Sequence, residues 1–300
     1  MGLLSVSLFG CVKVNHEQDL VDVKLTHSTQ GLLAYLILFR HRSHPREVLT
    51  EIFWGDKDPD RSRRSLNTAI WQLRGILEPR GVKRGTYLVS DHQDEISFNQ
   101  DSPFWLDVQT FNEGTCRAAA PGLTDIESIV PELEKAIALY RGDLLEGFYA
   151  DWALRERETL RSRYLSTMIF LMDVYCKRGD FEKSISCGRK ILEMDPLREE
   201  IHRKMMRMYL DGGQRAQAMR QYEICKEALA RELQIVPMQE TRDLYETSLS
   251  ITTSPLMLVR NDTPDLITAF STFHQAQAAF EKAQHDLLDS IQAIERLVKK

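Results

Sequence analysis

One segment of the 300-residue chain combines the side chains and the spacing of a DNA-reading helix. Between residues 58 and 77, apolar side chains recur at the i, i+3, i+4, i+7 spacing of one buried helix face: Leu66, Ala69, Ile70, Leu73 and Leu77. The opposite face carries Arg61, Arg64, Asn67, Thr68, Trp71 and Gln72, with Arg63 and Arg74 on its flanks. Guanidinium, amide and hydroxyl groups are those that contact phosphates and base edges in a DNA major groove. The segment therefore predicts a recognition helix.

The positive charge of this region contrasts with the acidic chain around it. The formal net charge is −5, whereas residues 61–84 hold seven basic side chains and a single acid, Glu78. A concentrated basic patch of this kind is typical of a local nucleic-acid contact. Beyond the helix we expect Arg80, Lys83 and Arg84 to contact phosphate or the minor groove, which would position the protein without specifying sequence.

The elements before the segment must position it. Short apolar stretches over residues 3–25 predict a small antiparallel sheet. A helix is expected over about 29–40 with Ser28 as its cap, and a second from near Pro45 to about Phe53.

The recognition helix itself is expected to begin at Pro59 or Asp60, because acids suit the positive end of a helix. After it, two alternating strands over 86–98 surround a polar turn and predict a hairpin, with His92 and Gln93 at its tip. The order of sheet, three helices and hairpin is that of a winged helix-turn-helix domain, in which the hairpin is the wing. The tip fits either a DNA contact or an ordinary exposed turn.

The next part of the chain is predicted to be helical. Residues 113–125 have the composition of a linker, and residues 126–250 are almost wholly helical in pattern. Residues 175–179 recur as residues 209–213, 34 positions later. This is the tetratricopeptide period, in which helix hairpins stack to bury a shared core.

A second polar linker over 251–264 is followed by an amphipathic stretch over 265–300. Apolar residues there recur every seven positions, interrupted by Gln277 and Gln284. Two interpretations stay open: a coiled-coil arm that forms a homodimer, and a helix that folds back to cap the repeats.

Composition excludes several classes of protein. The five cysteines are scattered and never spaced as CxxC, which indicates reduced thiols in a cytoplasm and no zinc site. The longest apolar run, residues 31–39, is too short to span a bilayer, and no signal peptide is evident, so we expect a cytoplasmic protein without membrane contact.

Patterns for metal binding and catalysis are absent or incomplete. Residues 56–60 resemble the start of a calcium loop, but Arg61 and Asn67 stand where such a loop requires Gly and Glu. His41 and His44 have no third ligand at suitable spacing. Without a P-loop, a GxGxxG motif or a nucleophile elbow, we expect no enzyme activity, no metal and no cofactor.

Two groups of motifs follow one another along the chain. The first group is 32–36, 46–49, 53–54, 58–66, 88 and 96–99, and the second is 105–111, 140–145, 148, 151–152, 178–180 and 195–200. In this order they resemble a family of bacterial transcription activators, the antibiotic-pathway regulators of the SARP type. The first group resembles their OmpR/PhoB-type winged helix, and the second their all-helical, tetratricopeptide-like bacterial transcriptional activation domain. The likeness covers about residues 1–250.

Elements and resemblance together predict a mainly α chain with a small α+β domain. The domains would be a winged helix over 1–112, an activation domain over 113–250, and a linker with an amphipathic helix over 251–300. The resemblance implies a sequence-specific activator that binds promoter repeats in double-stranded DNA as a homodimer and recruits RNA polymerase holoenzyme. The candidate DNA-binding residues are Arg61, Arg63, Arg64, Asn67, Thr68, Trp71, Arg74, Arg80, Lys83, Arg84 and His92.

A second function stays open beside this one. The acidic remainder of the chain and its extra terminal helix also fit a helical-repeat scaffold or signal-relay protein whose winged helix binds a protein partner. Trp71 is ambiguous in the same way, since an indole can stack on sugar-phosphate or cover a domain interface.

Overall fold

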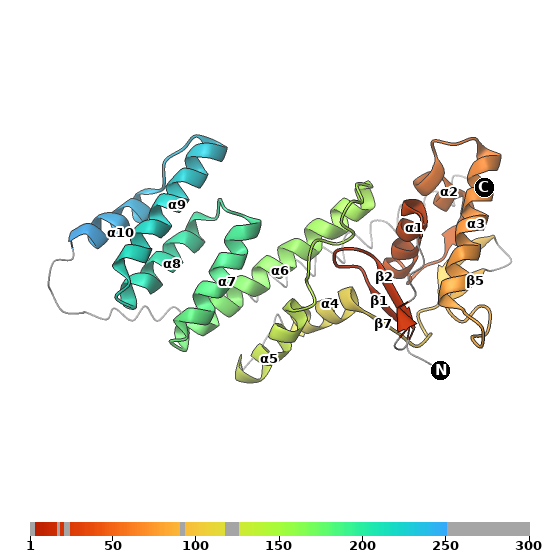
Figure 1. The fold of residues 1–300 in the computed structure, drawn as a ribbon, viewed down its shortest axis with the longest axis horizontal. Helices are drawn as coiled ribbons and strands as arrows, with labels where there is room; N and C mark the ends of the chain where they lie inside the picture. Colours follow the sequence, from red (N-terminus) through yellow and green to blue (C-terminus); the bar gives the residue numbers. More distant parts are fainter. Residues whose placement is uncertain (1–3, 17–18, 21–24, 91–93, 118–125, 251–300) are drawn as a thin grey trace, which may run out of the picture. The chain divides into compact units, whose positions relative to one another are not determined.

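The computed structural model describes residues 4–16, 19–20, 25–90, 94–117 and 126–250 (Figure 1). Over these residues the chain is mainly helical with two small sheets in its amino-terminal part, which confirms the predicted fold class. The described residues divide into two compact units, those within 1–114 together with 138–161, and those within 115–137 together with 162–250. The linker and amphipathic helix predicted over 251–300 lie outside the described residues.

The first sheet is mixed, whereas the sequence predicts an antiparallel one. Strands β1 (Leu4–Ser7), β2 (Lys13–His16) and β3 (Asp19–Leu20) pair antiparallel, but β7 (Phe104–Leu106) lies parallel to β1, with Leu4 opposite Phe104. A parallel pair joins distant residues and has no connecting turn to mark it, so periodicity did not reveal β7.

Three helices form the body of the winged domain: α1 (His27–Leu38), α2 (Arg46–Trp54) and α3 (Pro59–Leu77). The predicted positions of α2 and α3 are confirmed. The predicted cap of α1, Ser28, is wrong, because the hydroxyl of Thr26 accepts the backbone N–H of Thr29 at 3.3 Å and the helix begins one residue earlier than Ser28. The fully buried side chains that join the three helices include Leu32, Leu33, Leu36, Ile37, Leu49, Leu66, Leu73 and Leu77.

The second sheet contains the wing. Strands β5 (Leu88–Ser90) and β6 (Glu95–Phe98) form the predicted antiparallel hairpin, with Leu88 opposite Phe98. The short strand β4 (His44–Pro45), immediately before α2, pairs with the other edge of β6. The sheet therefore ties the start of α2 directly to the wing.

Helix α4 (Asp107–Arg117) follows β7. The prediction of a linker over 113–125 is therefore wrong for its first five residues, which are helical. Of the rest of that linker, residues 118–125 lie outside the described part. The buried Asp107 carboxylate accepts the N–H groups of Leu8 at 2.9 Å and Phe9 at 3.1 Å, which joins the start of α4 to the end of β1.

Residues 138–161 belong to the first unit although they lie far along the chain. Leu144 bridges Phe9 in an antiparallel backbone pair. The guanidinium of Arg157 donates to the carbonyls of Leu144, Leu145 and Phe148 at 2.7–2.9 Å, which fixes this loop. The Phe148 ring packs against Gly31 of α1, where a Cβ atom would lie only 2.6 Å from a ring carbon.

The second unit consists of helices, as predicted. They are α5 (Ile126–Ile137), the carboxy-terminal part of α6 (Asp151–Lys177), α7 (Phe181–Met194), α8 (Glu199–Asp211), α9 (Arg215–Leu233) and α10 (Gln239–Ser250).

The 34-residue repeat is visible in the turns between these helices. Gly179 and Gly213 both adopt positive φ, +77° and +70°, which glycine adopts without steric cost. The following residues donate their N–H groups to the carbonyls of Tyr175 and Tyr209 at 2.9 and 2.7 Å. Equal turns at equal spacing confirm the predicted repeat.

Candidate nucleic-acid interface

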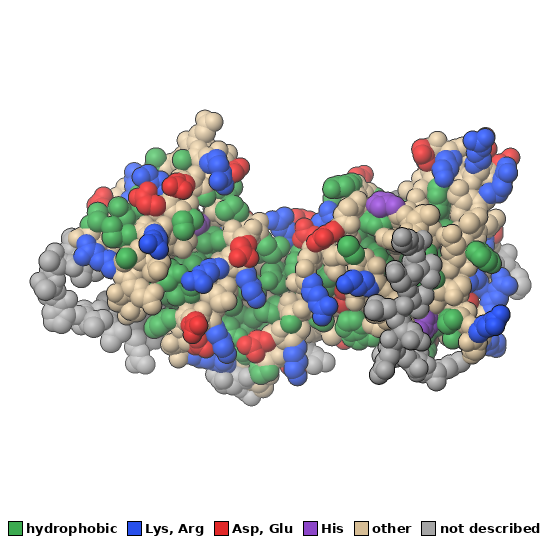
Figure 2. All heavy atoms as spheres, in the orientation of Figure 1, with side chains coloured by type: hydrophobic (Ala, Val, Ile, Leu, Met, Phe, Trp, Pro, Cys, Tyr) green, Lys and Arg blue, Asp and Glu red, His purple; other side chains and the backbone are tan. Residues whose placement is uncertain are grey.

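Helix α3 buries one face and exposes a basic one. The predicted apolar stripe is buried in full, and Ser62 and Ile76 join it. Arg61, Arg63, Arg64, Asn67, Thr68 and Trp71 are all exposed. Figure 2 shows Lys and Arg side chains gathered along the edge of the first unit where α3 lies in Figure 1.

The helix is anchored firmly at its amino terminus. Asp58 caps it by accepting the N–H of Asp60 at 3.1 Å, and Pro59 occupies the first turn. The buried Ser62 hydroxyl donates to the carbonyl of Trp54 at 2.7 Å and so fixes α3 against the end of α2. Lys57 lies beside this terminus and donates to Ser65 at 3.4 Å.

The exposed aromatic ring on this face is Trp71. Its side chain is 74% exposed, so within the described residues it covers no interface. A large indole left in water beside arginines is typical of a surface that meets a ligand, since it can stack on sugar or base.

The Asn67 side chain is hydrogen-bonded to a residue of another helix. Its Oδ1 accepts a hydrogen bond from the Arg46 guanidinium of α2 at 2.7 Å. The same guanidinium lies 2.8 Å from the Asp94 carboxylate of the wing. Arg46 thus connects α2, α3 and the wing.

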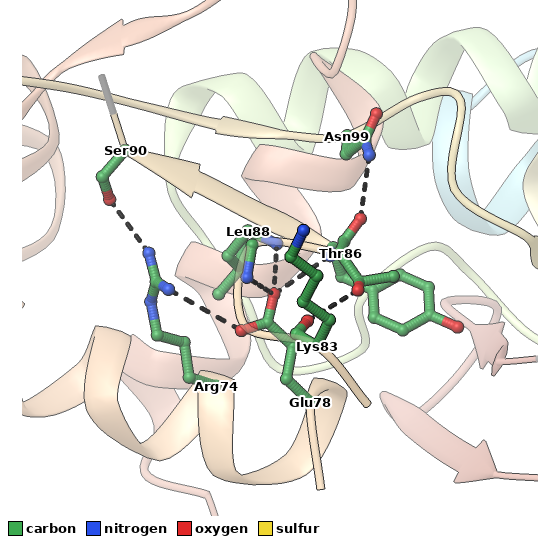
Figure 3. A network of polar contacts seen from close by, with 9 residues as sticks. Arg74, Glu78, Lys83, Thr86, Leu88, Ser90 and Asn99 are labelled. Atoms are coloured by element: carbon green, nitrogen blue, oxygen red, sulfur yellow. Dashed lines mark hydrogen bonds and ion pairs between the residues drawn. The ribbon is translucent and has the colours of Figure 1, made fainter. Parts of the chain in front are cut away.

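Arg74 and Glu78 connect the end of α3 to the wing (Figure 3). Glu78 has a side chain only 2% exposed, and its Oε1 accepts three backbone N–H groups, from Gly85, Tyr87 and Leu88, at 3.0–3.1 Å. Arg74 lies 3.7 Å from the other oxygen of Glu78 and donates to Ser90 at 3.1 Å. Glu78, the single acid within the basic patch, therefore fixes the loop that joins α3 to the wing strand β5.

The loop after α3 presents further cations. Arg80, Lys83 and Arg84 are exposed, and the carbonyl of Lys83 accepts both the N–H and the hydroxyl of Thr86. Between this loop, α3 and β5 lies an open groove of about 860 Å³. Its lining includes Asn67, Trp71, Arg74, Arg84 and Ser90.

The structure brings most of the predicted site residues onto one surface. The exposed set comprises Arg61, Arg63, Arg64, Asn67, Thr68, Trp71, Arg80, Lys83 and Arg84. Arg74 is half-buried and engaged within the domain, and His92 lies outside the described residues.

Three side chains differ from expectation. Gln72, assigned to the exposed face, is half-buried, and its Oε1 accepts the Thr29 hydroxyl of α1 at 3.4 Å. Sequence reasoning missed Arg46 and Lys57, which reach the α3 surface from α2 and from the α2–α3 loop. Neither residue lies within the periodic pattern of α3. Only the pairing of β4 with β6, which puts Arg46 beside the wing, could have revealed the place of Arg46 in the site.

The described residues contain no cluster of three His, Cys, Asp or Glu side chains arranged to hold a metal ion. His44, considered above as a ligand, is buried, and its Nε2 contacts the carbonyl of Phe39 at 3.1 Å. Burial lowers the pKa of His44 to about 4. No described helix is both long enough and apolar enough to cross a membrane.

Helix order, wing and helical repeats together define a winged-helix domain with an attached helical module. Residues 106–249 match the family model of the bacterial transcriptional activator domain. The chain is 27% identical over 267 residues to the transcriptional regulatory protein MoaR1 of Mycobacterium tuberculosis, and equally to MoaR1 of Mycobacterium bovis. These alignments cover 83% of this chain and 82% of each relative.

A solved structure shares the fold. EmbR of Mycobacterium tuberculosis, solved in complex with a low-affinity phosphopeptide, superposes with a TM-score of 0.56 at 20% identity, over 94% of this chain and 72% of EmbR. The matches thus indicate a transcriptional regulator with a bacterial transcriptional activator domain, and the winged-helix fold is shared with EmbR.

Proposed function

We propose that this regulator is a sequence-specific transcriptional activator that reads double-stranded DNA with the exposed face of α3. Arg61, Arg64, Asn67, Thr68 and Trp71 would enter the major groove. Arg63, Arg80, Lys83 and Arg84, together with His92 at the wing tip, would contact the backbone or minor groove. Arg74 would hold the wing strand β5 in position against α3.

The observation that carries the proposal is the composition of the exposed face. Six exposed side chains of α3 are guanidinium, amide, hydroxyl or indole groups, and the one acid of the helix, Asp60, lies in its first turn beside the cap. An exposed helix in an acidic chain usually carries both signs of charge, so this composition favours a polyanionic partner.

We assign DNA binding to residues 1–112 and activation to residues 113–250, the latter range close to the family match over 106–249. A pair of protomers would occupy promoter repeats in the cytoplasm, and the helical module would contact RNA polymerase holoenzyme. Residues 251–300 would extend the protomer contact.

A gel-shift titration of the full chain against genomic fragments tests the proposal. We expect saturable binding to a few fragments that survives excess competitor DNA, and loss of selectivity at the contacted base pairs in Arg64→Ala or Asn67→Ala. Arg207→Ala, an exposed arginine of α8, serves as the control and should bind like the wild type. No saturable, competitor-resistant binding would contradict the proposal and favour a winged helix that binds protein.

A further inference from the structure

The position of Arg46 is fixed by backbone pairing rather than by its own flexible side chain. His44 pairs with Ile96 and Pro45 with Glu95 in the β4–β6 ladder. The N–H of Arg46 then continues this ladder to the carbonyl of Asp94 at 3.2 Å. Arg46 is therefore held at the base of the wing.

Its side chain is held as well. The guanidinium Nε lies 2.8 Å from Asp94 Oδ1, and Nη1 lies 2.7 Å from Asn67 Oδ1, with the arginine side chain only 25% exposed. The contact from Nη1 to Asn67 is a hydrogen bond with a charged donor, which is among the stronger kinds in proteins, whereas Nε meets the exposed Asp94 carboxylate only as an ion pair. The two partners of Arg46 belong to different elements, Asn67 to α3 and Asp94 to the wing, so the guanidinium has little freedom to turn away.

This contact determines the orientation of the Asn67 amide. Arginine carries only hydrogen-bond donors, so the atom of Asn67 that faces it must be the oxygen. The amide nitrogen then lies on the other side, on an exposed residue that lines both the 860 Å³ groove and a second hollow of about 570 Å³ between α2 and α3. Asn67 consequently offers donors to a ligand in the groove.

An asparagine that reads adenine needs its oxygen as well as its nitrogen, because adenine presents an amino donor beside the N7 acceptor. Here the oxygen already accepts from a cation. An adenine amino group brought to it would lie beside the positive charge of Arg46, which is unfavourable. Guanine presents two acceptors, O6 and N7, and its O6 is attracted both by the amide N–H and by the guanidinium.

We propose that Arg46 is a positioning residue that makes Asn67 read guanine rather than adenine at one base pair of the DNA site. This inference rests on the proposed function, since it requires α3 to enter the major groove. It adds the identity of the base and a specificity determinant outside the recognition helix.

Selection from a randomised double-stranded library tests the inference with the full chain. The base pair read by Asn67 is the one at which Asn67→Ala loses preference. At that position we expect the wild type to select guanine. Arg46→Met, which removes the donor and the charge, should shift the guanine-to-adenine affinity ratio toward adenine by at least about tenfold, the range of one bidentate contact.

Three further variants separate positioning from simple stabilisation. Arg46→Lys keeps a positively charged donor and should keep the guanine preference. In an Asn67→Ala background, Arg46→Met should cause no further change in base preference at that position. Asn67→Asp keeps the partner of Arg46 but has no donor, so it should lose guanine selection while its unfolding curve matches the wild type, because the residue is exposed.

Selection of adenine by the wild type, an unchanged ratio in Arg46→Met, or guanine selection retained by Asn67→Asp would each overturn the inference while the proposed function stands. If the wild type selected no sequence at all, the proposed function would fail and the inference with it.

Discussion

Replacing Glu78 by alanine should remove the hydrogen bonds that hold the loop between α3 and β5 against the end of α3. The Glu78 carboxylate accepts three backbone N–H groups, and two of the donors, Tyr87 and Leu88, are buried. Each buried N–H left without an acceptor costs about 1–3 kcal/mol, whereas water can replace the acceptor at the half-buried Gly85. We therefore expect a loss of about 3 kcal/mol from the free energy of unfolding of the first unit.

Native-state hydrogen exchange measures this effect locally. The amides of Tyr87 and Leu88 should exchange about 100-fold faster in Glu78→Ala, since about 1.4 kcal/mol corresponds to a factor of ten. Glu78→Gln keeps an acceptor oxygen and should lose only about 1 kcal/mol. Glu47→Ala, an exposed acid on α2, is the matched control and should change stability by less than about 1 kcal/mol. Unaltered exchange at both amides in Glu78→Ala would refute this account of the wing.

Substitutions at three more positions test contacts within the first unit. Gly31→Val should lower the melting temperature in thermal unfolding, because its side chain would enter the space of the Phe148 ring at a cost of about 1–3 kcal/mol; an unchanged melting temperature would contradict the packing. Asp107→Ala removes the acceptor of three backbone N–H groups, those of Leu8, Phe9 and Val108, and should cost about 2–4 kcal/mol in urea unfolding, while Asp107→Asn, which keeps one acceptor, should cost less. Because burial holds the pKa of His44 at about 4, below its unfolded value, the unfolded chain binds more protons; stability should fall by up to about 3 kcal/mol as pH drops from about 6.5 to about 4. Urea titrations across this range should show a smaller pH dependence in His44→Asn, and equal slopes would refute the assignment.

Periodicity in the sequence predicted the elements that form through contacts between residues close in the chain. The bounds of α3 and its buried stripe follow from the spacing of Leu66, Ala69 and Leu73, and the hairpin follows from alternation about a polar turn. The 34-residue repeat was evident because each repeat packs mainly on its neighbours.

Contacts between distant residues could not be predicted in this way. The parallel pairing of β7 with β1 has no turn to signal it, and Ser28 resembled a cap as closely as Thr26 does. Arg46 and Glu78 act through partners that only the folded sheet supplies. Within the candidate site, the types of residue were therefore predictable, but the orientations of Asn67 and Arg74 were not.

The central claim, that the exposed face of α3 binds double-stranded DNA, is tested most directly by a salt titration. Six exposed cations on α3 and the loop after it (Arg61, Arg63, Arg64, Arg80, Lys83 and Arg84), at about 0.9 counterions per phosphate contact, predict a slope of log K against log salt of about −5 per protomer. Arg64→Ala should make this slope shallower by about one on a selected fragment and remove its advantage over competitor DNA, while Arg207→Ala leaves both unchanged. Equal slopes and equal selectivity in the wild type and Arg64→Ala would contradict the claim.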